Sequence, residues 1–240
     1  MNKKKIICLI CCRGGSKTIK NKNIKFFCGK PLLYWTIKSA QESGVFERII
    51  LSTDSKKIAN FAKALKIEVP GLRPKKLATS ESNQFDTHNY VFKKLNFNDK
   101  NSLVCVLNNN PFIDKNYIKK SYEVFKKNSF KGLVTDCSKV DGDYIAWKQC
   151  KINNKSLIYL FKKNFLSLDL NRQKLKSFFV NIFNIRWGKP SYLKSYLNFK
   201  KQLLKNNNKS IELKKIDNFD IDDNEDWFIA KTIFQKKIAK

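Results

Sequence analysis

The run Ile6-Ile7-Cys8-Leu9-Ile10-Cys11-Cys12, followed directly by Arg13-Gly14-Gly15-Ser16-Lys17, decides the class of fold. An uninterrupted apolar run predicts a strand that is buried on both faces, which is typical of a parallel sheet covered by helices. The glycines that follow predict a turn at the carboxyl end of this strand, where open α/β sheets bind their ligands. The segment therefore predicts both the fold class and the position of a binding site.

Strands and helices alternate on the carboxyl side of this segment. Further apolar strands are predicted at 48–52, 103–107 and 132–135. Helices are predicted from Pro31 to Gly44, after the capping segment 53–55, around 91–95, after Asp114 and over 223–240. This alternation predicts an α/β fold with a mostly parallel open sheet and helices on both faces.

The alternation breaks between about residues 138 and 195. Short aromatic-rich pieces at 144–147, 157–161 and 178–185 predict irregular strands. We expect a single domain over 1–240, with 138–195 forming an arm inserted before the final strand and helix. Such an arm would pack on a second subunit or cover a substrate.

The net charge needs careful interpretation. The 240 residues include 49 Lys and Arg against 20 Asp and Glu, a formal charge of +29, which raises the question of nucleic-acid binding. Only five of these basic residues are arginines, and the lysines are spread over every segment. Because arginine is the usual reader of phosphates and base edges, this distribution favours a general enrichment in lysine. We expect no nucleic-acid partner.

Composition also limits the compartment. Hydrophobic residues make up 42% of the chain, but no apolar stretch approaches the roughly 18 residues of a membrane span. The basic start of the chain leads into a short apolar run without a small-residue cleavage site. We therefore expect a soluble cytoplasmic protein with no membrane partner.

Cysteine and histidine usage argues against a metal site built from these residues. Of the seven cysteines, Cys8, Cys11 and Cys12 lie in the first predicted strand, where they are expected to act as small core residues. No second Cys/His pair at zinc spacing accompanies them. A single histidine, His88, cannot form a His-based metal site or a Ser-His triad by itself.

The segment from Cys12 to Ile24 matches neither of the two common nucleotide fingerprints, G-x-G-x-x-G and the P-loop. Its Arg-Gly-Gly-Ser-Lys and Lys-Asn-Ile pieces resemble the signature of the sugar cytidylyltransferases that make CMP-activated nonulosonic acids. The resemblance continues through 29–32, 43–46, 52–55, 72–74 and 77–79, and so covers the first 80 residues almost without a gap. Later features, including Gln173 and Trp187-Gly188, look most like the pseudaminic acid branch of this acylneuraminate cytidylyltransferase family.

The resemblance implies transfer of CMP from CTP to the anomeric hydroxyl of a sialic-acid-like acid, by a Rossmann-like nucleotidyltransferase that acts as a homodimer. It implies that Lys22 and Arg13 are catalytic, with Lys22 stabilising the charge that develops on the transferring phosphate. The residues implied in CTP binding are Arg13, Gly14, Gly15, Ser16, Lys17, Lys22, Asn23 and Arg73. Those implied in sugar binding are Asn109, Arg172, Gln173 and Asn184.

A metal is implied by Phe219-Asp220-Ile221-Asp222, which resembles the Asp-Ile-Asp motif that holds Mg²⁺ in the family. The residues agree with this role, because Asp220 and Asp222 alternate along an extended segment and present hard oxygens to one side. The acidic residues Asp223 and Glu225 are better explained as the start of a helix, stabilised by its dipole.

Two segments depart from the family pattern. Where the family has Gln-Pro-Thr-Ser-Pro or Tyr-Ala-Thr-Ala-Pro, this chain has Leu107-Asn108-Asn109-Asn110-Pro111. In the arm, Asp-Ala-Gly-Gln-Phe-Tyr or Asn-Gly-Ala-Ile-Tyr is replaced by Asn181-Ile182-Phe183-Asn184-Ile185-Arg186. Bulky residues in place of small ones predict a reshaped sugar pocket beside an intact nucleotide loop.

Other interpretations stay open at this stage. One is a non-catalytic relative that still binds CTP, and another is a cytidylyltransferase that uses Kdo. A third is a basic nucleic-acid-binding module, whose affinity would fall steeply with salt and would not depend on Asp220 or Asp222. An active enzyme should lose turnover when Lys22 or Asp222 is replaced, whereas a non-catalytic relative has none to lose.

Overall fold

The structure is a computed structural model and describes residues 4–16, 18–140, 150–153, 156–159, 178–214, 217 and 219–238. The strands are β1 (Lys5–Cys11), β2 (Phe26–Phe27), β3 (Lys30–Pro31), β4 (Arg48–Ser52), β5 (Ser102–Leu107), β6 (Val134–Val140), β7 (Cys150–Asn153), β8 (Ser156–Tyr159), β9 (Phe178–Gly188) and β10 (Lys209–Glu212). The helices are α1 (Leu32–Glu42), α2 (Lys56–Ala64), α3 (Gln84–Lys94), α4 (Lys115–Lys127), α7 (Pro190–Leu193), α8 (Tyr196–Leu203) and α9 (Asn224–Ile238), with 3₁₀ turns at Lys22–Ile24 and Lys75–Leu77.

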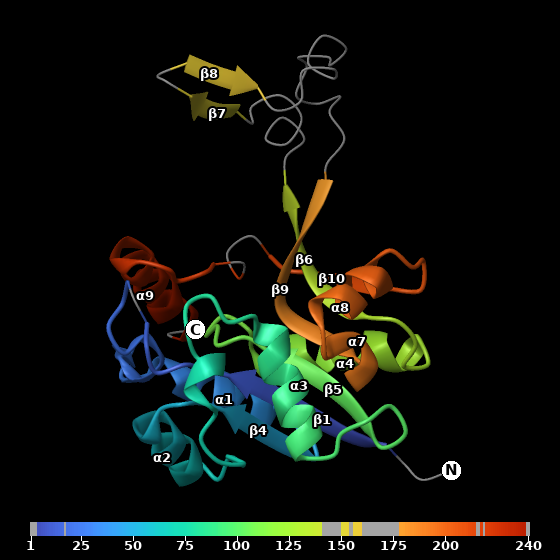
Figure 1. Cartoon of the computed structure of the whole chain (residues 1–240). Helices are drawn as coiled ribbons and strands as arrows, with labels where there is room; N and C mark the ends of the chain where they lie inside the picture. The colour runs from blue at the N-terminus through green and yellow to red at the C-terminus, as the bar shows by residue number, and fades with distance from the viewer. Residues whose placement is uncertain are drawn as a thin grey trace.

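The central sheet has six strands in the order β10-β6-β9-β5-β1-β4. Strand β1 pairs in parallel with β4 and β5, and β6 pairs in parallel with β10. Strand β9 runs antiparallel between β5 and β6. The predicted mostly parallel sheet with helices on both faces is confirmed (Figure 1).

The apolar run in β1 is explained by burial on both faces. Ile6, Cys8 and Ile10 belong to a core cluster with α1, α2 and α4, whereas Ile7 and Leu9 belong to a cluster with α3, α7 and α8. Each of these five side chains is at most 7% exposed. Burying an aliphatic side chain of this size contributes roughly 1.5–3 kcal/mol, so a polar residue on either face would be costly.

The cysteines of the first strand are core residues, as predicted. Cys8 and Cys12 are buried and Cys11 is half-buried, and all three are free thiols. Burial raises the pKa of Cys11 to about 11, although Arg73 and Arg186 act in the opposite direction. The thiol is therefore neutral at physiological pH and is not poised as a nucleophile.

Short-range capping signals set the helix ends as predicted. Ser55 caps α2 by accepting from the Ile58 N–H, and Asp114 caps α4 by accepting from the Tyr117 N–H at 2.9 Å. Gly44 follows the last residues of α1 with a φ of +63°, the conformation that glycine adopts most easily. No described helix is both long enough and apolar enough to cross a membrane.

A third core cluster attaches α9 to the segment that follows β1. Helix α9 contributes Trp227, Ala230 and Phe234, which recur at helical spacing, and the Phe27 ring lies 5.2 Å from the Trp227 ring. The same cluster contains Ile221, just before α9. The carboxyl-terminal segment is therefore packed beside the loop that follows β1.

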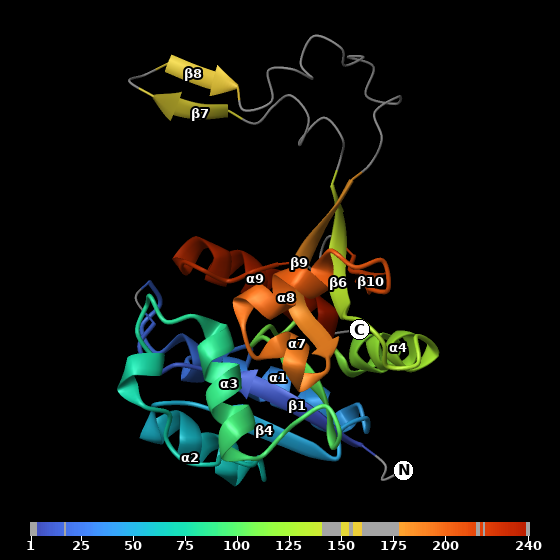
Figure 2. The ribbon, with the colours of Figure 1, turned by 45° about the vertical axis from the view of Figure 1, so that its right-hand side comes forward.

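The last residues of the predicted arm, 138–195, belong to the central sheet and the helix that follows it, and not to the arm. Strands β6 and β9 continue beyond the helical layers as an antiparallel ribbon whose last described pair is Val140–Phe178 (Figure 2). Strands β7 and β8 form a hairpin, whereas 144–147 lies outside the described residues. The end of β9 lies inside the central sheet, where Ile185 and Trp187 are fully buried, and α7 and α8 follow it. Trp187, at the end of β9, therefore packs in the core. The sequence pattern alone could not distinguish a buried strand of the sheet from a strand of the arm.

Candidate functional site

Three adjacent parallel strands end at one edge of the sheet, and the segments that follow them meet there. They are the glycine loop (residues 12–25) after β1, the segment 53–55 after β4, and the asparagine turn (residues 108–110) after β5. The β9 bulge (residues 181–186) lies beside the asparagine turn, since the Asn108 N–H donates to the Asn184 carbonyl at 2.8 Å. This is the edge at which open α/β folds bind ligands.

The glycine loop is held against the start of α2. The Gly14 N–H donates to Asp54 Oδ1 at 2.9 Å, and a Cβ at Gly14 would lie only 2.8 Å from the Cβ of Ser55. A Cβ at Gly15 would meet nothing within 4 Å, and Gly15 is exposed. Gly14 is thus required for close packing, whereas Gly15 leaves backbone open to a ligand.

Gly14→Ala is therefore expected to destabilise the protein by about 1–3 kcal/mol, the usual cost of overpacking a tight contact. Gly15→Ala is the matched control, and its unfolding free energy should stay within about 0.5 kcal/mol of wild type. Urea unfolding of the two variants measures the difference. Equal destabilisation of both would contradict this account of the loop.

Two positive charges lie at the rim of the site. Arg13 donates to the Thr79 carbonyl at 3.1 Å, and the Asn23 amide donates to the Arg13 carbonyl at 2.9 Å. Lys22 donates to the Ile221 carbonyl and is paired with Asp222, and its side chain is 22% exposed. Among the described residues Arg13 has a carbonyl and no carboxylate as its acceptor, so its charge is not neutralised there.

Arg73 lies deeper, with 6% of its surface exposed. Its guanidinium donates to Thr87 Oγ1 at 3.3 Å and lies 3.6 Å from Asp54 Oδ1, while its buried Nε has no hydrogen-bond partner among the described residues. Asp54 therefore joins Arg73 to the glycine loop through one carboxylate. The sequence indicated Asp54 as part of a capping segment and of the family resemblance at 52–55, but assigned it no role in the site.

The acidic segment (residues 219–223) presents its two predicted metal ligands outward. Ile221 is 3% exposed and packs in the third core cluster, whereas Asp220 and Asp222 on either side of it are exposed. Lys22 Nζ lies 3.7 Å from Asp222 Oδ1. The next acid, Asp223, instead caps α9 by accepting from the Asp226 N–H at 2.8 Å, and Asp226 accepts in return from the Asp223 N–H at 3.2 Å.

The donor set at Asp220 and Asp222 fits Mg²⁺ bound together with a phosphate. Within the described residues there is no group of three or more His, Cys, Asp or Glu that could hold a metal ion unaided. Mg²⁺ differs from structural zinc in this respect, because it is commonly held by one or two carboxylates together with substrate phosphates. Two exposed carboxylates beside Lys22 and the glycine loop match that pattern.

The predicted sugar-binding residues fall into two groups. Asn109 donates to Asn23 Oδ1 and accepts from Thr36 Oγ1, both at 2.8 Å. Asn184 is 5% exposed, and its N–H donates to Asp136 Oδ2 at 3.1 Å. Arg172 and Gln173, like Lys17 of the glycine loop, lie outside the described residues.

The β9 bulge keeps a backbone conformation that suits glycine. Phe183, which replaces the glycine of the family's Asp-Ala-Gly-Gln-Phe-Tyr pattern, has a φ of +63°, which is rare for an aromatic residue. The buried carboxylate of Asp136 stabilises the β9 bulge by accepting from the N–H groups of Asn184 and Ile185. The Phe183 ring packs at 5.4 Å from the Phe199 ring of α8.

Buried ionisable groups lie behind the bulge. Arg186, which is 1% exposed, donates to Gln84 Oε1 at 2.8 Å and to Asn108 Oδ1 at 3.1 Å. Burial raises the pKa of Asp136 to about 6, against the opposing effects of its backbone donors and Arg186. Burial and the charge of Arg186 lower the pKa of His88 to about 3, so its neutral ring donates from Nδ1 to the Leu193 carbonyl.

These two pKa values predict how stability changes with pH. The pKa of His88 in the folded state lies below the unfolded value of about 6.5, so its contribution is full above pH 6.5 and is lost as the pH falls toward 3. The pKa of Asp136 is raised in the folded state, so the folded protein binds this proton more readily than the unfolded chain. Asp136 therefore adds stability as the pH falls from about 6 to 4, an effect opposite to and smaller than that of His88. When the pH is lowered from 7 to 4, the Tm measured by calorimetry should fall less for His88→Gln than for wild type, and more for Asp136→Asn. The same fall in Tm for His88→Gln and wild type would contradict the lowered pKa of His88.

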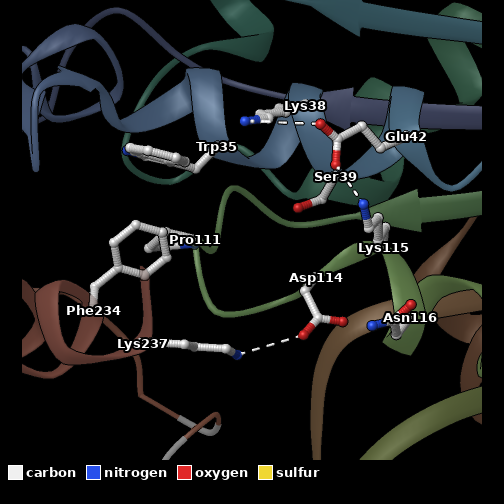
Figure 3. A pocket seen from close by; sticks show the side chains of 10 residues that line it. All are labelled: Trp35, Lys38, Ser39, Glu42, Pro111, Asp114, Lys115, Asn116, Phe234 and Lys237. Atoms are coloured by element: carbon white, nitrogen blue, oxygen red, sulfur yellow. Dashed lines mark hydrogen bonds and ion pairs between the residues drawn. The ribbon is translucent and has the colours of Figure 1, made fainter. Parts of the chain in front are cut away.

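A separate pocket of about 270 Å³ lies between α1, α9 and the start of α4 (Figure 3). Trp35, Pro111 and Phe234 are among its lining residues. Its lysines are paired with carboxylates: Lys38 and Lys115 share Glu42, and Lys237 pairs with Asp114 (Figure 3). The glycine loop is the better place for a phosphate, because it combines the exposed backbone of Gly15 with the charge of Arg13, whose described acceptor is a carbonyl.

Comparison with known proteins identifies the family of the chain and supports its fold. The chain matches the cytidylyltransferase family over residues 7–214. It is 30% identical to a pseudaminic acid cytidylyltransferase of Campylobacter jejuni over 65% of this chain and 67% of that protein. It is 28% identical to an N-acylneuraminate cytidylyltransferase of Escherichia coli over 97% of this chain and 53% of that protein. A solved CMP-2-keto-3-deoxy-manno-octonic acid synthetase in complex with CTP superposes with a TM-score of 0.68 at 12% identity, covering 98% of this chain and 100% of that one, which supports the fold.

Proposed function

Because the chain belongs to the cytidylyltransferase family, we propose that it transfers CMP from CTP to the anomeric hydroxyl of a nonulosonic acid and releases pyrophosphate. The observation that carries the proposal is the contact between Lys22 of the glycine loop and the acidic segment. This contact supports the proposal because it joins the loop that we assign to phosphate binding to the segment that carries the two carboxylates we assign to metal binding. That combination suits a triphosphate bound with a divalent cation.

In this proposal the glycine loop binds the triphosphate of CTP. The N–H groups of Gly15 and Ser16 would donate to its oxygens, and Arg13 and Arg73 would balance its charge. The predicted contact of the Gly14 N–H with CTP is not supported, because that N–H donates to Asp54. Lys17, which lies outside the described residues, would add a further cation. Asn23 supports the loop through its bond to the Arg13 carbonyl. Removing Arg73 would also leave Asp54 without its cation, so this residue supports both binding and the shape of the loop.

Asp220 and Asp222 would hold Mg²⁺, which neutralises phosphate charge and orients the α-phosphate when bound. Lys22 of the glycine loop contacts Asp222 and the Ile221 carbonyl, so it can stabilise charge on the transferring phosphate and hold the acidic segment in place. The acceptor's anomeric oxygen forms a bond to the α-phosphorus and releases its proton to the surrounding water. The bond from the α-phosphorus to the bridging oxygen breaks, and pyrophosphate leaves.

We place the acceptor beside the asparagine turn and the β9 bulge, which are hydrogen-bonded to each other. Asn184 of the bulge would contact the acid, and Arg172 and Gln173, outside the described residues, would complete the sugar site. The predicted contact of Asn109 with the sugar is not supported, because both ends of its amide are bonded to Asn23 and Thr36. The pseudaminic acid and acylneuraminate relatives support a nonulosonic acid as acceptor. We further propose a cytoplasmic homodimer in which the arm contacts the second subunit, without nucleic-acid or membrane partners.

The proposal is tested by measuring pyrophosphate release from CTP and Mg²⁺ with a panel of pseudaminic, legionaminic, N-acetylneuraminic and Kdo acids. Release with one nonulosonic acid is expected and would identify the substrate. Release with Kdo alone would replace the proposed acceptor by an eight-carbon acid. CTP binding without release for any acid would instead support a non-catalytic relative.

A further inference from the structure

We propose that the asparagine turn is a positioning device that holds the β9 bulge, the glycine loop and the acidic segment in register. This inference rests on the proposed function, because it assigns each of those segments a role in the reaction. The turn replaces the Gln-Pro-Thr-Ser-Pro and Tyr-Ala-Thr-Ala-Pro patterns of the family, so it is a property of this chain. Each of its three side chains contacts a different part of the site.

Asn108 is bonded to the β9 bulge by both ends of its amide. Its Nδ2 donates to the Phe183 carbonyl at 3.1 Å, and its Oδ1 accepts from the Arg186 guanidinium at the same distance. The main chain adds a third bond, from the Asn108 N–H to the Asn184 carbonyl. The strained φ of Phe183 is therefore held from β5 as well as by Asp136.

Asn109 is bonded to the glycine loop and to α1. Its Nδ2 donates to Asn23 Oδ1, and its Oδ1 accepts from Thr36 Oγ1. Asn23 passes the connection on through its own amide to the Arg13 carbonyl. The position of Arg13 at the rim is thus linked to the end of β5 through two amides.

Asn110 is bonded to the acidic segment. It is 4% exposed, its Nδ2 donates to the Phe219 carbonyl at 3.1 Å, and its Oδ1 accepts from the Phe112 N–H at 2.9 Å. The carbonyl it contacts belongs to the residue immediately before Asp220. Asn110 therefore restrains the backbone from which the proposed metal ligands project.

Asparagine suits all three positions because one short side chain supplies a donor and an acceptor at once. The partners determine the orientation of each amide: the carbonyls of Phe183 and Phe219 can only accept, and the Phe112 N–H and Arg186 can only donate. Asn23 is oriented by the Arg13 carbonyl and in turn orients Asn109. The three amides make six side-chain hydrogen bonds, and in each bond the amide nitrogen donates or the amide oxygen accepts, as the partner requires.

The test replaces each asparagine by alanine in the full chain and measures CTP affinity by calorimetry, with and without Mg²⁺, together with the KM for the acid. Asn109→Ala should weaken CTP binding about 3- to 10-fold whether or not Mg²⁺ is present, the effect of one or two lost hydrogen bonds. Asn110→Ala should leave the affinity for CTP without Mg²⁺ within about 2-fold of wild type. It should raise the Mg²⁺ concentration that gives half of the maximal effect on CTP affinity by about 3- to 10-fold. Asn108→Ala should leave both unchanged and raise the KM for the acid.

Controls separate positioning from simple loss of stability. Asn98→Ala removes an exposed asparagine in the turn at the other end of β5, whose amide bonds only locally, and should change none of these parameters. If Asn110→Ala fails to fold, Asn110→Ser keeps an acceptor for the Phe112 N–H and loses the bond to Phe219.

The inference is supported if Asn109→Ala changes the affinity for CTP, Asn110→Ala changes the dependence on Mg²⁺, and Asn108→Ala changes the KM for the acid. Equal effects on one parameter, or a lowered Tm with unchanged CTP, Mg²⁺ and acid dependence, would overturn it. Failure of the proposed function looks different, because wild type would then release no pyrophosphate with any acid. The CTP and Mg²⁺ measurements on Asn109→Ala and Asn110→Ala would still decide the inference in that case, and absence of CTP binding by wild type would reject both.

Discussion

Lys22→Ala is expected to lower kcat for pyrophosphate release by about 10²- to 10³-fold, the usual effect of removing a group that stabilises charge in the transition state. The variant loses the ammonium nearest to the proposed metal carboxylates and also the bond to the Ile221 carbonyl. Both losses act where the α-phosphate would be transferred. Steady-state kinetics at saturating CTP and Mg²⁺ measure the change.

Lys20→Ala is the matched control, because Lys20 is an exposed lysine of the same loop. It removes the same charge from the chain and should change kcat less than about 2-fold if long-range steering alone is affected. Lys22→Arg should recover part of the rate, since a guanidinium keeps the charge with a different reach. A kcat for Lys22→Ala as high as that for Lys20→Ala would remove Lys22 from the catalytic machinery.

Asp222→Asn is expected to lower kcat/KM by about 10²-fold or more at physiological Mg²⁺, because the neutral amide is a much weaker ligand for a hard cation. Raising the Mg²⁺ concentration should restore part of the activity if Asp220 still contributes an oxygen. The side chain of Asp222 is 80% exposed, so the substitution should have little effect on folding. Activity is measured as a function of Mg²⁺ concentration.

The neighbouring acid supplies a matched control. Asp223→Asn removes the same charge one residue further on, but asparagine caps a helix as well as aspartate does. It should keep near wild-type kinetics and Tm. Equal loss of activity in Asp222→Asn and Asp223→Asn would mean that the negative charge of the segment matters, and not a ligand at Asp222.

Local signals predicted much of the fold and of the nucleotide side of the site. The apolar run at 6–12, the caps at Ser55 and Asp114, and Gly44 at the end of α1 each act over a few residues, so the sequence contains the whole signal. The glycine loop and the Asp220-Ile221-Asp222 alternation were predictable for the same reason. The register of β9 in the sheet was not, because it depends on pairing between residues about 80 apart in the chain.

The partners of buried polar groups could not be predicted in the same way. The departure of residues 107–111 from the family pattern indicated a changed pocket, yet it did not indicate that Asn108, Asn109 and Asn110 contact three separate segments. Arg186 gave no sequence signal of its own, since a single arginine near the end of a strand is usually exposed. Asp136 was missed because a carboxylate within an apolar strand carries no periodic pattern.

By itself, then, the sequence determined a mostly parallel sheet covered by helices on both faces, a cationic glycine loop at its carboxyl edge and an alternating pair of carboxylates before the last helix. These follow from burial and backbone preference, which are set residue by residue. Only the tertiary structure decided which amides, guanidiniums and carboxylates meet behind that edge. Hydrogen bonds between distant segments form only after the strands have paired, and their geometry depends on the register and packing of the whole sheet.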